Sequence, residues 1–263
     1  MQNLQAQVSN ELGASIGFCN YLGDLQDKDL TFKSPGFSFG VTAKHTFSSM
    51  FALRGNFNVG RISGNDELSN KLKNRNRNLS FRSHIIELGV VAEISALPFD
   101  RYNHLNSSNK RYFNWTPYFV GGLNLFHFNP KARYEGVWVP LRPLGTEGQN
   151  TSFNSQREYS LTQVGLPFGL GLKFQLSSQI CVAFEIGARK TFTDYLDDVS
   201  GLYPDQTLLQ NEKGKVAADL SYRGDELTQG VGVNPTNSVR GNSANMDWYT
   251  MNTLTFTYKF YKN

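Results

Sequence analysis

Residues 163–191, QVGLPFGLGLKFQLSSQICVAFEIGARKT, contain two runs in which a large apolar side chain occupies every second position. These positions are Val164, Leu166, Phe168, Leu170, Leu172 and Phe174 in the first run, and Ile180, Val182, Phe184, Ile186 and Ala188 in the second. A period of two places alternate side chains on opposite faces of an extended chain, so each run predicts a β-strand with one apolar face. The segment Leu176-Ser177-Ser178 joins the two strands as a tight turn.

The same alternation recurs in six other stretches, at 11–21, 36–47, 51–62, 81–96, 116–128 and 248–261. Strands of soluble domains average about five or six residues, whereas a tilted strand that crosses a bilayer needs roughly nine to eleven. Eight strands of this length predict an all-β fold, an eight-stranded antiparallel transmembrane β-barrel that forms a single domain over residues 1–263. Residues 1–8 are interpreted as a residual leader or N-terminal tail, because Leu4-Gln5-Ala6-Gln7 is typical of a small-residue cleavage site.

The connections between the predicted strands alternate in length. Long loops are expected at 22–34, 63–80, 129–162 and 192–247, while the connections at 48–49 and 176–178 are very short. Outer-membrane barrels have long extracellular loops and mostly short periplasmic turns, so the four long loops are predicted to face outward. The connection at 97–115 departs from this rule, because it is long on the periplasmic side.

Bulk composition narrows the class of protein. The chain has 26 lysines and arginines against 22 aspartates and glutamates, a net charge of only +4, and the basic residues are dispersed. This composition argues against nucleic-acid binding. The absence of an apolar run of about 18 residues excludes helical membrane spans. Cys19 and Cys181 are predicted to lie too far apart for a disulfide, and no cysteine or histidine motif indicates a metal or cofactor.

Alternation alone does not say which face of the barrel points outward, because a soluble lipocalin-like barrel turns its apolar face inward. The strand length and the polar face favour the membrane, since that face combines glycine with isolated charges of both signs. We expect these charges to form ion pairs inside a narrow lumen filled by side chains. The predicted lumen charge network consists of Glu11, Lys44, Arg54, Glu87, Glu93, Lys173, Glu185 and Arg189.

Aromatic residues cluster at the ends of the predicted strands. Rings with one polar edge are enriched at the two boundaries of a membrane. The residues predicted to lie at these boundaries are Tyr21, Trp115, Tyr118, Trp248, Tyr249 and Tyr261.

The sequence offers no catalytic constellation. Ser83 and His84 are adjacent on a strand and therefore point to opposite faces, so they do not form a nucleophile and base. Glu87 and Glu93 share a face but stand about 20 Å apart at the rise of a strand, too far for a two-carboxylate hydrolase. A lipid hydrolase is therefore the least favoured of the functions considered, and a non-enzymatic role is predicted.

Two loop clusters carry open alternatives. Asp194, Asp197 and Asp198 form either a calcium site of clustered oxygens or, as we favour, an acidic loop base paired with nearby cations. A basic patch is equally compatible with lipopolysaccharide phosphates and with a merely solvated loop. This patch comprises Lys71, Lys73, Arg75, Arg77 and Arg82.

Several segments resemble one family of outer-membrane barrels. They are ELGASIGFCNYLGDL (11–25), LGTEGQ (144–149), YSLTQVGLPFGLGLK (159–173), EIGARKTFTDYLDDVSG (185–201), RGN (240–242) and DWY (247–249). The likeness runs nearly end to end and is similar to the Bacteroidetes barrels of the PorG type, which are associated with the type IX (Por) secretion apparatus.

This resemblance implies a location in the outer membrane, contact with its lipids, and a role in tethering a periplasmic ring made of a lipoprotein and its partner. The ring contact is expected at the long periplasmic turn, at Arg101, Lys110 and Arg111. The alternative is a stand-alone barrel whose loops bind surface glycan or another outer-membrane protein.

Overall fold

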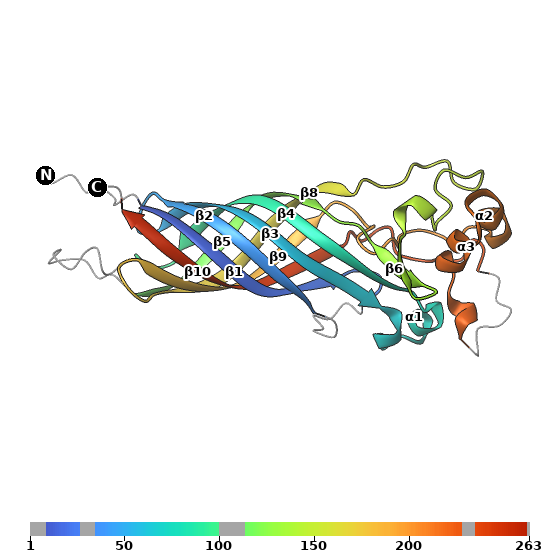
Figure 1. The fold of residues 1–263 in the computed structure, drawn as a ribbon, viewed down its shortest axis with the longest axis horizontal. Helices are drawn as coiled ribbons and strands as arrows, with labels where there is room; N and C mark the ends of the chain where they lie inside the picture. The colour runs from blue at the N-terminus through green and yellow to red at the C-terminus, as the bar shows by residue number, and fades with distance from the viewer. Residues whose placement is uncertain (1–8, 27–34, 100–113, 228–234, 262–263) are drawn as a thin grey trace, which may run out of the picture.

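The computed structural model describes residues 9–26, 35–99, 114–227 and 235–261, and within them eight long strands close into an antiparallel barrel (Figure 1). These strands are β1 (Ser9–Leu22), β2 (Gly36–Thr46), β3 (Phe51–Asn65), β4 (Ser80–Ser95), β5 (Trp115–His127), β8 (Thr162–Gln175), β9 (Ile180–Thr191) and β10 (Trp248–Tyr261). Each strand pairs with the next in this order, and β10 pairs with β1 to close the cylinder. The predicted fold and all eight predicted strands are therefore confirmed.

The barrel turns its apolar face outward. Along β2, Phe39 is 63 % exposed, whereas the neighbouring Ser38, on the opposite face, is 2 % exposed. The same alternation exposes large apolar side chains on every strand of the barrel, and a belt of this kind is stable only against hydrocarbon. The lipocalin-like alternative is excluded, because it would bury this face. No helix in the described ranges is long and apolar enough to cross a bilayer.

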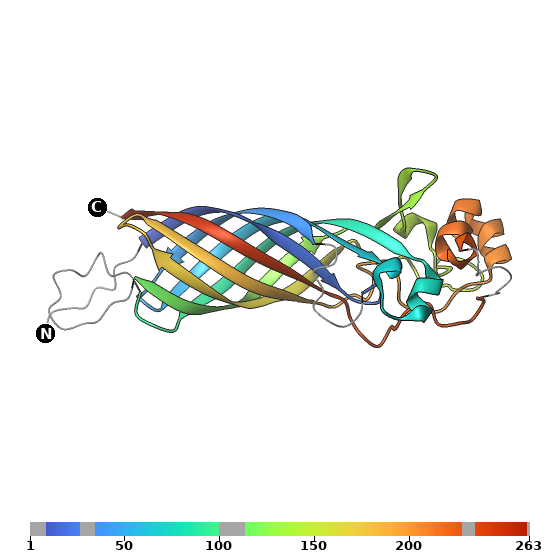
Figure 2. The same ribbon diagram turned by 90° about the horizontal axis from the view of Figure 1, so that it is seen from below.

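The two ends of the barrel differ. At one end, Ser9 of β1 pairs with Tyr261 of β10, and two tight turns close with hydrogen bonds from Phe47 N to Phe51 O (3.0 Å) and from Leu176 N to Ile180 O (2.9 Å). The opposite end carries an ordered cap built from the long loops (Figures 1 and 2). Its elements are α1 (Leu72–Arg77), α2 (Gln206–Lys213), α3 (Lys215–Ser221), the hairpin β6 (Lys131–Tyr134) and β7 (Val137–Pro140), and the 3₁₀ turns Asp66–Leu68, Arg142–Leu144 and Gly224–Glu226.

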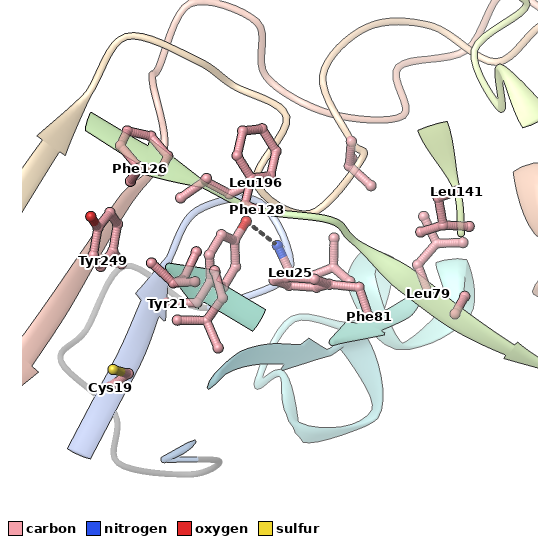
Figure 3. Close-up of a cluster of buried hydrophobic side chains, with 14 of the residues drawn as sticks. Cys19, Tyr21, Leu25, Leu79, Phe81, Phe126, Phe128, Leu141, Leu196 and Tyr249 are labelled. Atoms are coloured by element: carbon pink, nitrogen blue, oxygen red, sulfur yellow. Dashed lines mark hydrogen bonds between the residues drawn. The ribbon is translucent and has the colours of Figure 1, made fainter. Parts of the chain in front are cut away.

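An apolar core, which the sequence did not lead us to expect, fills the outer end of the barrel and the base of the cap (Figure 3). Its largest members in the barrel wall include Tyr21, Phe81, Phe126 and Tyr249, all on inward-facing positions. From the cap, side chains such as Leu196 pack against them. The strands β3 and β4 have 15 and 16 residues, more than a bilayer requires, so their outer ends extend into the cap.

The two cysteines stay apart in the fold. Cys19 on β1 lies opposite Met251 of β10, whereas Cys181 on β9 lies opposite Thr257 of the same strand. Both thiols are free and buried.

Candidate functional site

The lumen carries a network of ion pairs centred on Glu93 of β4. Its carboxylate lies 2.5 Å from Lys173 Nζ, 3.8 Å from Lys44 Nζ and 3.7 Å from Arg54 Nη1. These three cations come from β8, β2 and β3, so one carboxylate connects four strands of the wall. Burying this carboxylate away from water costs free energy, and the surrounding cations offset that cost.

Two further carboxylates complete this inner network. Lys44 Nζ lies 2.9 Å from Glu11, and Arg54 Nη2 lies 2.7 Å from Glu185. The Tyr118 hydroxyl also donates to Glu185, at 3.1 Å. Lys44 and Arg54 each contact Glu93 and one further carboxylate, so the ion pairs form one connected network.

A second cluster surrounds Glu87, nearer the outer end. Arg189 Nε lies 3.3 Å from its carboxylate, and the Tyr249 hydroxyl donates to it at 2.7 Å. The amides of Asn58 and Asn124 donate at 2.9 and 2.8 Å. These neutral donors were missed in the sequence, where only charged residues were considered as partners.

The structure thus places all eight residues of the predicted lumen charge network inside the barrel. None of the eight is more than 8 % exposed to solvent. Paired side chains therefore occupy the interior, as expected for a narrow eight-stranded cylinder. What this arrangement can do is fix the strand register and rigidify a membrane-embedded cylinder.

The predicted interface aromatics divide into two groups. Trp115 is exposed on the outer wall at the inner end of β5, and Trp248 lies at the outer end of β10, where it packs edge-on against Phe168 at 5.8 Å between ring centroids. The side chain of Tyr261 lies outside the described residues, as do Arg101, Lys110 and Arg111, the expected contacts of the periplasmic ring.

The interface assignment was wrong for Tyr21, Tyr118 and Tyr249. Each is at most 1 % exposed and points into the barrel. The reason is strand parity: because Phe119 faces lipid, its neighbour Tyr118 must face the lumen. The same parity applies to the other two tyrosines, whose hydroxyl groups find carboxylate partners inside.

The outer end of the lumen is closed by a third polar cluster, above the membrane belt. The Tyr21 hydroxyl donates to Asp197 and, at 3.3 Å, to Asp247. Asp247 in turn accepts from the backbone N–H of Leu196 at 2.9 Å. These contacts attach the loop after β9 to the first and last strands.

Arg240 holds the rest of this loop. Its guanidinium lies 3.0 Å from Glu147, donates to the backbone carbonyl of Asp198, and lies 3.8 Å from the Asp198 carboxylate. Glu147 also accepts from the backbone N–H groups of Ser200 and Gly201, at 2.8 and 3.0 Å. We call Tyr21, Asp197, Asp247, Arg240, Glu147 and Asp198 the outer plug. The loop segments 144–149, 191–201 and 240–242, which carried the sequence resemblance, meet here.

Two carboxylates of the acidic loop have protein partners of their own. Asp197 accepts from Tyr21, and Asp198 accepts from Thr146 at 2.5 Å and Tyr159 at 2.7 Å, so their carboxylates point to separate partners. Across the described ranges, no three His, Cys, Asp or Glu side chains are grouped to hold a metal ion.

Burial governs the protonation of the acidic loop. Loss of solvation raises the pKa of Asp194 to about 7. Burial likewise raises the pKa of Asp198 to about 6, against the opposing charge of Arg240. The contact between Asp198 and Arg240 agrees with the interpretation that we favoured, in which the acidic loop is paired with a nearby cation.

The predicted basic patch also divides. Arg77 is buried and forms two 2.7 Å hydrogen bonds to Asp66, and Arg82 stacks on Trp138 with its guanidinium carbon 3.6 Å from the ring centroid. The remaining members, Lys71, Lys73 and Arg75, are exposed on the cap. Only these three present their charge to solvent.

Comparison with known proteins gives a family and low-level structural likenesses. Neisserial surface protein A is 10 % identical with a TM-score of 0.44, over 95 % of this chain and 97 % of that one. Ail of Yersinia pestis, solved in complex with the heparin analogue sucrose octasulfate, is 8 % identical with a TM-score of 0.41, over 98 % and 100 %. A major outer membrane protein of Thermus thermophilus is 11 % identical with a TM-score of 0.41, over 96 % and 99 %.

Likeness at this level assigns neither ligand nor partner, and the barrel architecture follows from the strand pairings themselves. A search of curated proteins found no significant match. The model of a family described as a domain of unknown function, DUF6089, matches residues 1–238 of the 263. The protein therefore belongs to the DUF6089 family.

Proposed function

We propose that this protein is a non-enzymatic barrel of the bacterial outer membrane that anchors or positions periplasmic ring components of a type IX secretion apparatus. The observation that carries the anchoring role is the plugged lumen inside a lipid-facing apolar belt. A cylinder closed by ion pairs, with its charged groups committed to one another, serves as a rigid attachment in the membrane. The resemblance to PorG-type barrels directs the proposal to type IX secretion.

The residues that a hydrolase would use are committed elsewhere. Ser83 is buried and its hydroxyl oxygen accepts from Asn129 N at 2.8 Å, whereas His84 lies on the opposite, exposed face. Glu87 and Glu93 are each surrounded by donors and cations of the lumen. These contacts support a structural rather than a catalytic use of the barrel.

Affinity purification of the tagged protein from native membranes in mild detergent, followed by mass spectrometry, tests the proposal. We expect a lipoprotein and a partner protein of the periplasmic ring to co-purify. Charge reversal at the periplasmic turn, Arg101→Glu, Lys110→Glu and Arg111→Glu together, should abolish this recovery. The matched control reverses three exposed cations of the cap, Arg75→Glu, Arg133→Glu and Arg157→Glu, and should leave recovery intact.

Two outcomes would contradict the proposal. Recovery of the ring by the turn variant would reject the contact at 97–115. Failure of the unmodified protein to recover any periplasmic ring protein would reject the secretion role itself.

A second function, a stand-alone barrel that binds through its loops, is favoured by the ordered cap. Arg77 donates to the backbone carbonyls of Arg240 and Asp24, at 2.6 and 2.8 Å, and so ties three loops into one surface. That surface exposes apolar side chains, among them Leu72 and Val239. The same purification would support this function if it returned another outer-membrane protein or surface glycan in place of the ring.

A further inference from the structure

A pocket of about 670 Å³ opens at the outer rim of the barrel, where β1 ends and β10 begins. One part of its wall comes from α1 and the segment just before it, and another from residues 239–242 and 244–246 of the last loop. Figure 2 shows α1 near the loop that leads into β10. A volume within the range of about 300–1,000 Å³ suits a small ligand or a headgroup.

The floor of this pocket belongs to the lipid-facing surface. Leu22, Trp248 and Lys190 pair side by side on β1, β10 and β9, and all three stand on the outward face of their strands. The pocket is therefore continuous with the apolar belt, at the level where a tryptophan ring and a long cationic side chain meet the headgroups.

Positive charge dominates the wall. Lys71, Lys73 and Lys190 line the pocket, are exposed, and form no ion pair with any carboxylate in the described parts of the chain. By contrast, Arg77 and Arg240, which also reach the pocket, are committed to Asp66 and to Glu147. The lysines are thus the charges left for a ligand.

One carboxylate, that of Asp24, also lines the pocket. It accepts from the backbone N–H of Asn242 at 2.6 Å and is attracted by the nearby charge of Arg77. Its negative charge is therefore partly offset within the protein. Against three lysines, the pocket keeps an excess of positive charge.

We propose that this pocket binds the phosphorylated headgroup of an outer-leaflet lipid. Lysine ammonium groups bind phosphate as compact point charges. With phosphates at Lys71, Lys73 and Lys190, the acyl chains of such a lipid continue along Leu22 and Trp248 into the apolar belt. This site is independent of the anchoring role, because it lies at the opposite end of the barrel from the periplasmic turns.

Native mass spectrometry of the detergent-purified full chain, doped with diphosphorylated lipid A, tests this site. Lipid A should occupy the protein at least tenfold more than the uncharged lipid phosphatidylcholine. The variant Lys71→Gln, Lys73→Gln, Lys190→Gln should lose most of this occupancy, whereas Lys131→Gln, Arg133→Gln, Arg157→Gln, on other parts of the cap, should keep it. Trp248→Ala should weaken lipid A binding.

Equal binding of lipid A by the lysine variant and the unmodified chain would overturn the proposal. Equal occupancy by phosphatidylcholine would do the same. Inorganic pyrophosphate serves as the third probe, since full displacement of lipid A at similar concentrations would identify a site for free phosphate rather than for a lipid. Heat-modifiability on gels establishes that each variant is folded, and the comparison of lipids on the unmodified chain needs no variant.

Discussion

Glu93 and Lys173 face each other inside the barrel, with Lys173 Nζ 2.5 Å from Glu93 Oε1, although they come from β4 and β8 and are separated by β5. Both side chains are almost fully buried. The pair therefore spans one strand of the wall and connects residues 80 positions apart in the sequence. An intact buried ion pair contributes little to the net free energy of folding. Removing one member, however, leaves the other charge buried without a partner.

Replacing Glu93 by glutamine should therefore be strongly destabilising, because three cations lose their shared partner. We expect a loss of about 3–5 kcal/mol in the free energy of unfolding. Urea unfolding in detergent micelles, followed by intrinsic fluorescence, measures this loss. The matched control is Glu226→Gln, which removes a pair with Arg223 in which the Glu226 side chain is half exposed, and should cost about 0–1 kcal/mol. Equal effects of the two variants would contradict the role of the network.

Gly171 makes room for a tyrosine ring in the lumen. A Cβ atom at this position would lie 2.2 Å from Cζ of Tyr118, whose hydroxyl donates to Glu185. Gly171→Val should displace the ring, break that hydrogen bond and destabilise the barrel by about 1–3 kcal/mol. The same urea titration applies. Gly121→Ala is the control, since its Cβ meets no atom within 4 Å, and a similar loss there would show that strand propensity rather than the ring is responsible.

Arg240 is expected to hold the cap without being required for the barrel. Arg240→Met leaves Glu147 and Asp198 buried with no cation between them, which costs roughly 3 kcal/mol and opens the cap about 100-fold more often. Limited proteolysis should then cut residues 192–247 faster, while heat-modifiability on gels still reports a folded barrel. Lys215→Met, which removes an exposed pair with Asp219, should leave cleavage unchanged. Unaltered cleavage of the Arg240 variant would refute the outer plug.

We expect the stability of the cap to depend on pH with a sign opposite to that given by most carboxylates. Burial raises the pKa of Asp194 to about 7, whereas an unfolded aspartate titrates near 4. Between these values the folded loop keeps a proton that the unfolded loop has released, so raising the pH from about 4 to 7 destabilises the cap. Asp194→Asn should flatten this slope and stabilise the cap at pH 8. Proteolysis rates at pH 5 and pH 8 measure both effects, and an unchanged slope in the variant would exclude Asp194 as their source.

The sequence alone determined the barrel, because a period of two in each strand states which residues share a face. Phe39 and Leu170 indicate the lipid side, and the charges between such residues indicate the lumen. Strand length then separates a bilayer from a soluble core. The same alternation also predicts that Tyr118 lies inside, because its neighbour Phe119 belongs to the apolar face.

Tertiary structure alone decided which lumen groups meet and what closes the outer end. Barrel closure and stagger bring Glu93 of β4 to Lys173 of β8, a pairing that no local pattern encodes. In the sequence, Phe81 and Phe126 are indistinguishable from other strand residues. They belong to an apolar core only because the cap folds over the inner face of the wall at their positions. Likewise, Lys190 on β9 joins Lys71 at one pocket, although 119 positions separate them in the sequence, because the chain brings the two segments together there. Periodicity fixes the face on which a side chain lies, but its partners depend on how the chain closes in space.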